Sequence, residues 1–116
     1  MSVPAVSGDP MISVLTAALD GLSLRQRVIA DNVANVDTPN FRATSVDFES
    51  SLRDAVEQGH GEVGATLTPT DTPVGANGNN VDLRKEMLAA TQTQYQYQLM
   101  SRAVSDQFQL IKIAAS

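Results

Sequence analysis

The strongest constraint on this chain is a regular 3–4 spacing of apolar residues near each of its two ends. The N-terminal pattern covers residues 9–38, where Asp9 can cap free backbone N–H groups and Pro10 is tolerated at the first helical position. Asp37-Thr38-Pro39 ends the pattern, because proline lacks the N–H that would continue a helix. Its apolar members are Ile12, Leu15, Leu19, Leu22, Ile29, Val33 and Val36, with Gln26 as the polar interruption. The spacing predicts a long amphipathic helix.

The same spacing returns over residues 81–116. Asp82 can cap this second long helix, and Glu86 suits the positive end of its dipole. One line of apolar residues, interrupted by Gln94 and Ser101, consists of Leu83, Met87, Ala90, Tyr97, Val104, Phe108, Ile111 and Ala115. A flanking line consists of Leu88, Tyr95, Leu99, Ala103, Leu110 and Ile113. Together the two lines make an apolar surface wider than one partner helix can cover.

The simplest arrangement of the two long helices is an antiparallel, coiled-coil-like hairpin, which gives a mainly α fold. If residues whose numbers sum to about 120 lie opposite each other, Ile12 faces Phe108 and Gln26 faces Gln94. One hypothesis is that the two glutamines hydrogen-bond and fix the register, as a lone polar residue does in coiled coils. The alternative is that each glutamine faces solvent independently.

Between the long helices we expect a turn and a short helix within residues 39–58. The apolar residues of this short helix, which starts at about Asp47, recur every four positions: Phe48, Leu52 and Val56. Glu49 and Glu57 are each four residues from Arg53, so we expect two charge pairs on the helix surface. Gly59 is a natural stop.

Residues 59–80 are rich in glycine, threonine and proline and predict a flexible connector, while residues 1–8 predict a disordered N-terminus. Val63, Ala65 and Leu67 alternate as a short strand would, but no partner strand is evident in the sequence. Asn77-Gly78 adds turn character. A loop of this length within a compact domain indicates disorder or a functional insert.

Several functional classes lack the residues that they need. The formal net charge is −5, and the 8 basic residues are scattered among 13 acidic ones, which argues against nucleic-acid binding. There is no cysteine, and His60, the one histidine, has no neighbouring ligands. Asp47, Glu49, Asp54 and Glu57 predict a solvated face. We therefore expect no catalytic, cofactor-binding or metal site, and neither a Sec signal nor a membrane span.

The excess of apolar helix surface predicts assembly. A hairpin of two helices leaves part of both stripes uncovered, and other chains can cover the remainder. We expect the assembly seam to consist of Ile12, Leu15, Leu19, Leu22, Ile29, Val33, Val36, Leu83, Met87, Tyr97, Val104, Phe108 and Ile111.

Two segments carry a resemblance to a known family. Residues 31–52, DNVANVDTPNFRATSVDFESSL, resemble the N-terminal signature of the bacterial flagellar axial proteins, the rod and hook proteins, and most of all the proximal, B-type members of the basal-body rod family. Residues 78–108 are similar to the other end of that family, so the two segments cover about two thirds of the chain. The signature residues are Asn32, Ala34, Asn35, Asp37, Thr38, Pro39, Phe41, Asp47 and Phe48. Asn40 stands where the family commonly has glycine, and it can adopt the left-handed geometry that glycine favours.

The resemblance implies a structural subunit that is exported by the flagellar type III apparatus and polymerises through its terminal helices into the rod that crosses the periplasm. It also implies partners: other rod subunits, further copies of the chain, the MS-ring, the hook-basal body adapter protein and the export gate. The alternative function is a small helical cytoplasmic adaptor or export chaperone. A membrane-surface amphipathic helix is disfavoured, because the basic polar face that such helices carry is missing.

Asn32 and Asn35 lie about one helical turn apart in the signature. Both amides could therefore face a neighbouring subunit and hydrogen-bond its backbone, or they could simply face solvent.

Overall fold

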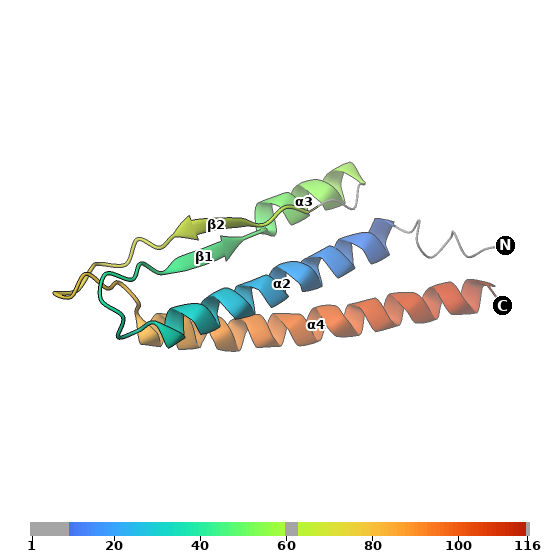
Figure 1. Cartoon of the computed structure of the whole chain (residues 1–116). Coiled ribbons are helices and arrows are strands. Elements are labelled where there is room, and N and C mark those ends of the chain that lie inside the picture. The colour runs from blue at the N-terminus through green and yellow to red at the C-terminus, as the bar shows by residue number, and fades with distance from the viewer. Residues whose placement is uncertain (1–9, 60–62, 116) are drawn as a thin grey trace.

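The computed structural model describes residues 10–59 and 63–115 of the 116-residue chain. These residues form five elements: α2 (Pro10–Ala34), β1 (Thr44–Asp47), α3 (Glu49–Gln58), β2 (Thr66–Pro69) and α4 (Leu83–Ala115). The two long helices run antiparallel along a body of 62 × 23 × 19 Å, and Figure 1 shows the β1–β2 pair and α3 above α2 and α4 below it. The predicted mainly helical fold, with paired terminal helices and a short middle helix, is confirmed. The predicted disordered segment 1–8 lies outside the described residues.

The first helix ends at Ala34, four residues earlier than its predicted limit. The backbone then closes two short turns, in which Val36 N–H donates to Val33 O (3.2 Å) and Thr38 N–H donates to Asn35 O (3.0 Å). Val36 therefore lies in a turn, and its placement on the helical stripe was wrong.

The register of the two long helices is close to the predicted one. Asn32 of α2 hydrogen-bonds Glu86 of α4, and Gln26 and Gln94 line the same open groove. Both glutamines are exposed, however, and no hydrogen bond joins them in the described part of the chain, so the hypothesis that they fix the register was wrong. α4 has 33 residues and α2 has 25, so α4 is longer by about 12 Å at 1.5 Å per residue.

The buried core lies between α2 and β1. Its centre consists of Ala18 and Leu22 from α2 and Val46 and Phe48 from the β1 segment. The Phe48 ring rests directly on the backbone of Gly21, where an added Cβ would lie 2.8 Å from two ring carbons. Glycine at position 21 is therefore what allows the β1 segment to approach α2 so closely.

A two-stranded antiparallel sheet was not predicted. β1 pairs with β2 in a register that sets Val46 opposite Leu67, so the connector does contain a strand with a partner. Only Val46 is buried among the paired residues, while every residue of β2 is exposed. The expectation that the alternating residues near 63–67 lacked a partner strand was wrong, since these short strands carry almost no burial signal.

The middle helix starts two residues later than predicted, because Asp47 belongs to β1 and Phe48 occupies the N-cap position. It ends as expected at Gly59, whose φ of +74° is the left-handed C-cap conformation. Ala55 is its buried residue, whereas Val56 is exposed.

Candidate assembly site

After α2 the chain enters a turn that is held by hydrogen bonds from the side chains of the turn residues. Asn35 donates from Nδ2 to Asp31 O (2.8 Å), and Thr38 Oγ1 donates to Asn35 Oδ1 (3.0 Å). Asn40 then takes a φ of +65°, which confirms the predicted left-handed geometry, and its N–H donates to Asn77 O (2.9 Å). The family segment 31–52 therefore contacts the chain just before the start of the family segment 78–108.

Two consecutive asparagines hold this meeting point. Asn79 is buried and donates from Nδ2 to the carbonyl oxygens of Asn35 and Thr38, both at 2.8 Å. These carbonyls lie in the turns just past the end of α2, where they also accept the N–H groups of Thr38 and Phe41. Asn80 accepts the Ala43 N–H at Oδ1 (2.6 Å) and donates its own N–H to Phe41 O (3.2 Å). We call residues 35–43 and 75–81 the signature junction.

Gly78 fits the junction because it has no side chain. Its φ is +79°, and a Cβ there would lie 2.2 Å from Asn40 Oδ1. Its carbonyl accepts from Arg42 Nε (3.0 Å). The predicted turn at Asn77-Gly78 is confirmed, and its role is to seat the second segment against the first.

Asn32 joins three elements. It is 1% exposed, donates from Nδ2 to Thr44 O (2.8 Å) and Glu86 Oε1 (3.0 Å), and accepts from Thr44 N (3.3 Å). Asn35 is also engaged within the chain, so the prediction that both amides face a neighbouring subunit was wrong. Glu86 is buried against α2. From the sequence, Glu86 was expected only to interact with the dipole of its own helix, so this burial was not predicted.

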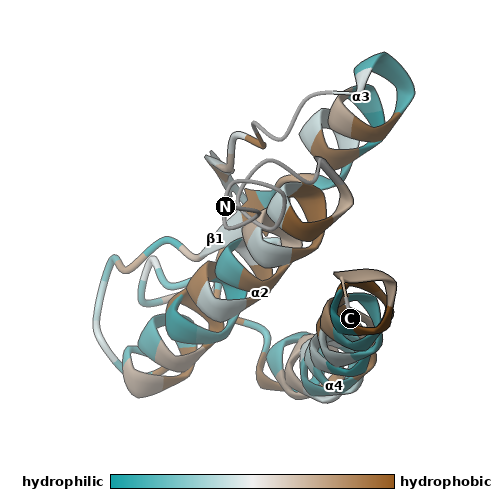
Figure 2. Cartoon of the chain, turned by 90° about the vertical axis from the view of Figure 1, so that its right-hand side faces the viewer, coloured by the Kyte–Doolittle hydropathy of each residue, from teal (hydrophilic) through white to brown (hydrophobic). Residues whose placement is uncertain are grey.

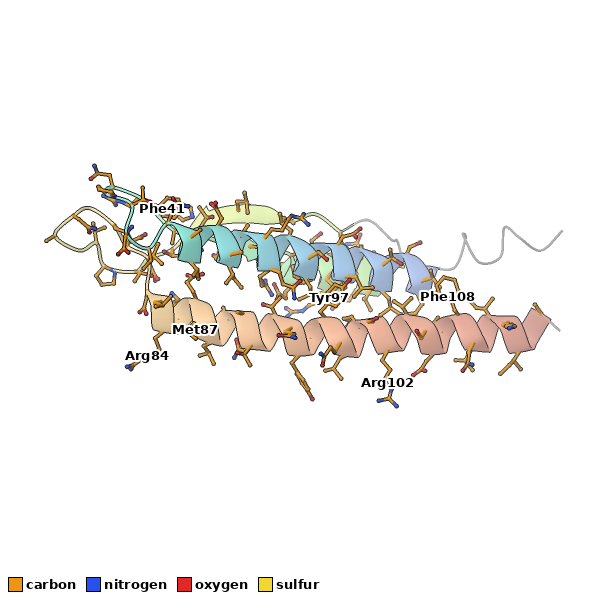
Figure 3. The ribbon with its side chains drawn as sticks, turned by 60° about the horizontal axis from the view of Figure 1, so that its bottom comes forward. Phe41, Arg84, Met87, Tyr97, Arg102 and Phe108 are labelled. Atoms are coloured by element: carbon orange, nitrogen blue, oxygen red, sulfur yellow. The ribbon has the colours of Figure 1, made fainter. Side chains whose placement is uncertain are left out.

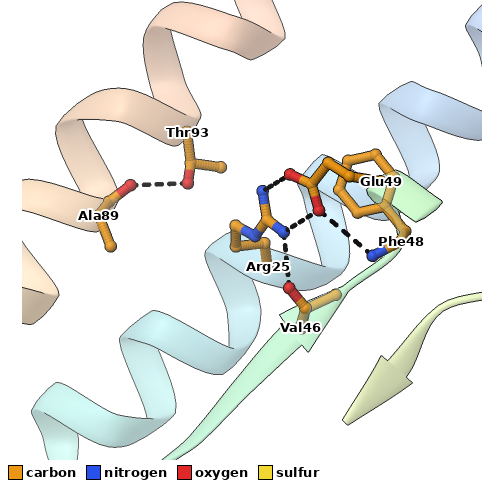
Figure 4. Close-up of polar contacts among 6 residues, drawn as sticks. All are labelled: Arg25, Val46, Phe48, Glu49, Ala89 and Thr93. Atoms are coloured by element: carbon orange, nitrogen blue, oxygen red, sulfur yellow. Dashed lines mark hydrogen bonds and ion pairs between the residues drawn. The ribbon is translucent and has the colours of Figure 1, made fainter. Parts of the chain in front are cut away.

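A polar clamp lies at the other end of β1. Arg25 makes two hydrogen bonds of 2.7 Å to the carboxylate of Glu49, donates to Val46 O (2.6 Å), and lies over the Phe48 ring at 4.9 Å (Figure 4). The hydrogen bonds from Arg25 lower the pKa of Glu49. Glu49 therefore pairs across the fold, and neither predicted pair with Arg53 forms in the described part of the chain. Nothing in the local sequence marks Arg25, because its partner is 24 residues away.

The other signature residues lie mainly at the surface. Phe48 is buried in the core, and Phe41 is half-buried. The exposed ones are Ala34, Asp37, Thr38, Pro39 and Asp47.

The predicted seam is only partly the interface between α2 and α4. Its α2 members are buried or half-buried, and on α4 this is true of Tyr97, Val104 and Ile111. Leu83, Met87 and Phe108 are exposed by 44%, 62% and 43%, so the hairpin itself does not bury them.

Each exception has a geometric reason. Leu83 would face residue 37, beyond the end of α2. Met87 is rotated by about 80° from the line through Tyr97. Phe108 points toward α2 but lies opposite its first turns (Figure 3). The buried positions include polar Glu86 and Thr93, which an apolar pattern cannot find; Thr93 Oγ1 donates to Ala89 O (2.6 Å).

The opposite face of α4 carries an uncovered apolar line. Its five large side chains are 47–69% exposed, and we call them the outer stripe: Leu88, Tyr95, Leu99, Leu110 and Ile113. At about 100° per residue, all five lie within about 40° of the direction opposite Tyr97. Figure 3 shows Arg102 of α4 pointing away from α2, and Figure 2 shows the apolar C-terminal turns of α4. Five of the six residues of the predicted flanking line therefore lie on the face that the described residues leave open, while Ala103 is half-buried.

The described residues do not assemble a reactive centre. They contain no group of three or more possible metal ligands, and none of the helices is long and apolar enough to cross a membrane. A pocket of about 350 Å³ between β1, β2 and α4 is lined by both apolar and charged side chains, among them Arg25, Ile29, Val46 and Lys85.

The chain is an elongated antiparallel pair of helices. Its junction is held by hydrogen bonds, and one face of α4 carries an exposed apolar stripe. These features define a structural assembly subunit. The family model for flagella basal body rod proteins matches residues 12–42, which include most of α2 and most of the first segment of the junction. The chain is 35% identical to the flagellar basal body rod protein FlgB of Bacillus subtilis, over 87% of this chain and 89% of the relative. It is 36% identical to FlgB of Borreliella burgdorferi (82% and 87% covered) and 32% identical to FlgB of Escherichia coli K12 (84% and 91% covered). The chain belongs to this FlgB family of flagellar basal body rod proteins, which are structural and not enzymes.

Proposed function

We propose that this chain, a structural subunit of the flagellar basal-body rod, polymerises by burying the outer stripe of α4 against neighbouring subunits. The observation that carries the proposal is the exposure of five large apolar side chains on one face of a long helix. Contiguous apolar patches of this kind mark protein interaction sites, because their burial removes apolar surface from water.

Two charged residues interrupt the outer stripe and suit a specific contact. Arg102 and Asp106 lie on the same face, and neither is in an ion pair in the described part of the chain. Charged groups within an apolar interface contribute more to register and partner choice than to affinity. We propose that they fix how neighbouring subunits align.

The seam residues that remain exposed extend the proposed surface beyond the stripe. Met87 and Leu83 lie near the junction end of α4, and Phe108 lies near its other end. We propose that these side chains pack against adjacent subunits, while the half-buried seam residues hold the hairpin that presents them.

The finer partners and the route of export rest on the family resemblance. We propose that the neighbours include other rod subunits and copies of this chain, together with the MS-ring, the hook-basal body adapter protein and the export gate. We also propose export by the type III apparatus and a place in the periplasm-spanning rod. The cytoplasmic adaptor or chaperone is not favoured, because relatives named as rod proteins match 82–87% of the chain.

The test compares paired glutamate substitutions in cells that lack their own copy of the gene. Leu99→Glu and Leu110→Glu place a charge in the outer stripe, whereas Gln98→Glu and Gln109→Glu place the same charge on the adjacent exposed residue. We expect the leucine variants to lose swimming and the glutamine variants to retain it. All four purified chains should have the same circular dichroism. Normal swimming by both leucine variants would refute the stripe as the assembly surface.

A further inference from the structure

Asn77 is the one asparagine in the chain that is followed by glycine. It is exposed and lies in the signature junction, immediately before Gly78. We infer that Asn77 is a deamidation site, that the closed junction suppresses the reaction, and that the rearranged product prevents the junction from closing.

The chemistry needs only water. The backbone nitrogen of Gly78 loses its proton and attacks Cγ of the Asn77 side chain, and the Cγ–Nδ2 bond breaks as ammonia leaves with that proton. The resulting five-membered succinimide adds one water at either carbonyl carbon. Opening at one carbonyl gives aspartate with the normal backbone, and opening at the other gives isoaspartate, in which the main chain runs through the side-chain carbon. Glycine at the following position speeds ring closure because it has no side chain to obstruct the attack.

In the folded junction both reacting groups are hydrogen-bonded. The Gly78 N–H donates to Gly75 O (3.0 Å), so the attacking nitrogen is occupied. The Asn77 side-chain oxygen accepts from Asn79 N (3.2 Å), which fixes the orientation of the amide that must be attacked. The hydrogen bond from Gly78 N–H must break before this nitrogen can attack, and the hydrogen bond to the Asn77 side-chain oxygen restricts how the amide can turn.

The two products have different consequences for the junction. Asn77 O accepts from Asn40 N (2.9 Å), and Gly78 O accepts from Arg42 Nε (3.0 Å). In isoaspartate Cβ enters the main chain ahead of the carbonyl that is bonded to Gly78 N, and the former Asn77 carbonyl becomes a carboxylate that branches from Cα. The longer main chain and the moved oxygen cannot keep both of these partners in place. Aspartate leaves the backbone unchanged, and its carboxylate can still accept from Asn79 N.

The first experiment measures the rate of the reaction in the full chain. The protein is incubated at mildly alkaline pH, either folded or unfolded in urea, and isoaspartate is quantified by peptide mass spectrometry and isoaspartyl methyltransferase labelling. We expect the folded chain to react about tenfold more slowly, which corresponds to about 1.4 kcal/mol and matches the scale of breaking the hydrogen bond of the attacking nitrogen. Asn77→Ser should abolish the product in both conditions. Equal rates in the folded and unfolded chains would overturn the inference.

The second experiment separates the rearranged backbone from the new charge. Chain aged in urea and refolded is compared with Asn77→Asp, which carries the same charge on a normal backbone. We expect the isoaspartate-containing fraction to melt at a lower temperature than Asn77→Asp, and Asn77→Asp to melt close to the wild type. An isoaspartate fraction as stable as Asn77→Asp would show that the junction tolerates the rearrangement and would overturn that part of the inference.

Discussion

Replacing Gly21 with alanine is a sharp test of the packing between α2 and β1. At an open helical position this substitution stabilises a protein by roughly 1 kcal/mol, because glycine is the more flexible residue. Here the new Cβ would lie 2.8–2.9 Å from three carbons of the Phe48 ring. An unstrained carbon–carbon contact is about 3.5–4.0 Å, so the ring must move by roughly 1 Å.

The ring has little room to move. Phe48 is 3% exposed, and the Arg25 guanidinium lies over it. Overpacking of this kind costs roughly 1–3 kcal/mol, which exceeds the helix-propensity gain. The middle of that range, about 2 kcal/mol, less the gain of about 1 kcal/mol leaves an expected fall of about 1 kcal/mol in the free energy of unfolding and of roughly 4 °C in the melting temperature. Urea and thermal denaturation followed by far-ultraviolet circular dichroism measure both quantities.

A double-mutant cycle isolates the contact. Phe48→Leu removes the ring, so adding Gly21→Ala in that background should be neutral or stabilising, whereas it destabilises the wild type. The coupling between the two changes should be at least about 1 kcal/mol. A Gly21→Ala chain as stable as the wild type, or an equal loss in both backgrounds, would refute the account of this contact.

Three further predictions follow from the polar contacts. Asn32→Ala should lower the free energy of unfolding, measured by urea denaturation, by about 2–3 kcal/mol, because it leaves the half-buried backbone groups of Thr44 and the buried carboxylate of Glu86 without their partner; a fall below about 0.5 kcal/mol would contradict this. Because the folded-state pKa of Glu49 is lowered, the stability from its pair with Arg25 is present above the unfolded pKa and is lost as pH falls through the folded pKa. Glu49 is half exposed, so the loss of unfolding free energy at acid pH should stay below about 1 kcal/mol. Glu49→Gln should make the unfolding free energy fall less as the pH is lowered. An unchanged fall would exclude the Glu49–Arg25 pair as its source. Asn79→Ala should increase proteolysis at the end of α2, and wild-type resistance would argue against its capping role.

The long helices and their register could be predicted because apolar residues spaced three and four apart lie on one face of a helix. Helix ends and turns could also be predicted. Gly59 ends α3, and Asn40 takes the left-handed conformation. Asp82 accepts the Lys85 N–H at its side chain (3.1 Å), as an N-cap does. Each of these features depends on residues that are close together in the sequence.

The sequence could not show which face of α4 packs against α2. Met87 and Glu86 are neighbours, and a 3–4 spacing can be drawn through either side of the helix. The structure buries polar Glu86 because Asn32 satisfies it, and it leaves apolar Met87 at the surface. A pattern based on hydrophobicity selects the opposite residue, since it cannot include a partner on another helix.

The sheet and the clamp depend on pairings across longer stretches of chain. Val46 is the one buried residue of the β1–β2 pair, so the alternation that normally reveals a strand is nearly absent. Arg25 could have paired with several nearby acids, and only the path of β1 brings Glu49 to it. The asparagine contacts of the junction have the same origin, because they join segments about 40 residues apart.

The most direct test of the account is the accessibility of the outer stripe before and after assembly. The chain has no cysteine, so Leu99→Cys or Leu110→Cys introduces a unique thiol on the open face of α4. Variants that still assemble are labelled with a maleimide as the isolated chain, in purified basal bodies, and in basal bodies denatured with detergent. The account predicts labelling of the isolated and denatured chains and protection in intact basal bodies. Equal labelling of the thiol in intact and denatured basal bodies would contradict the claim that neighbouring subunits cover this face.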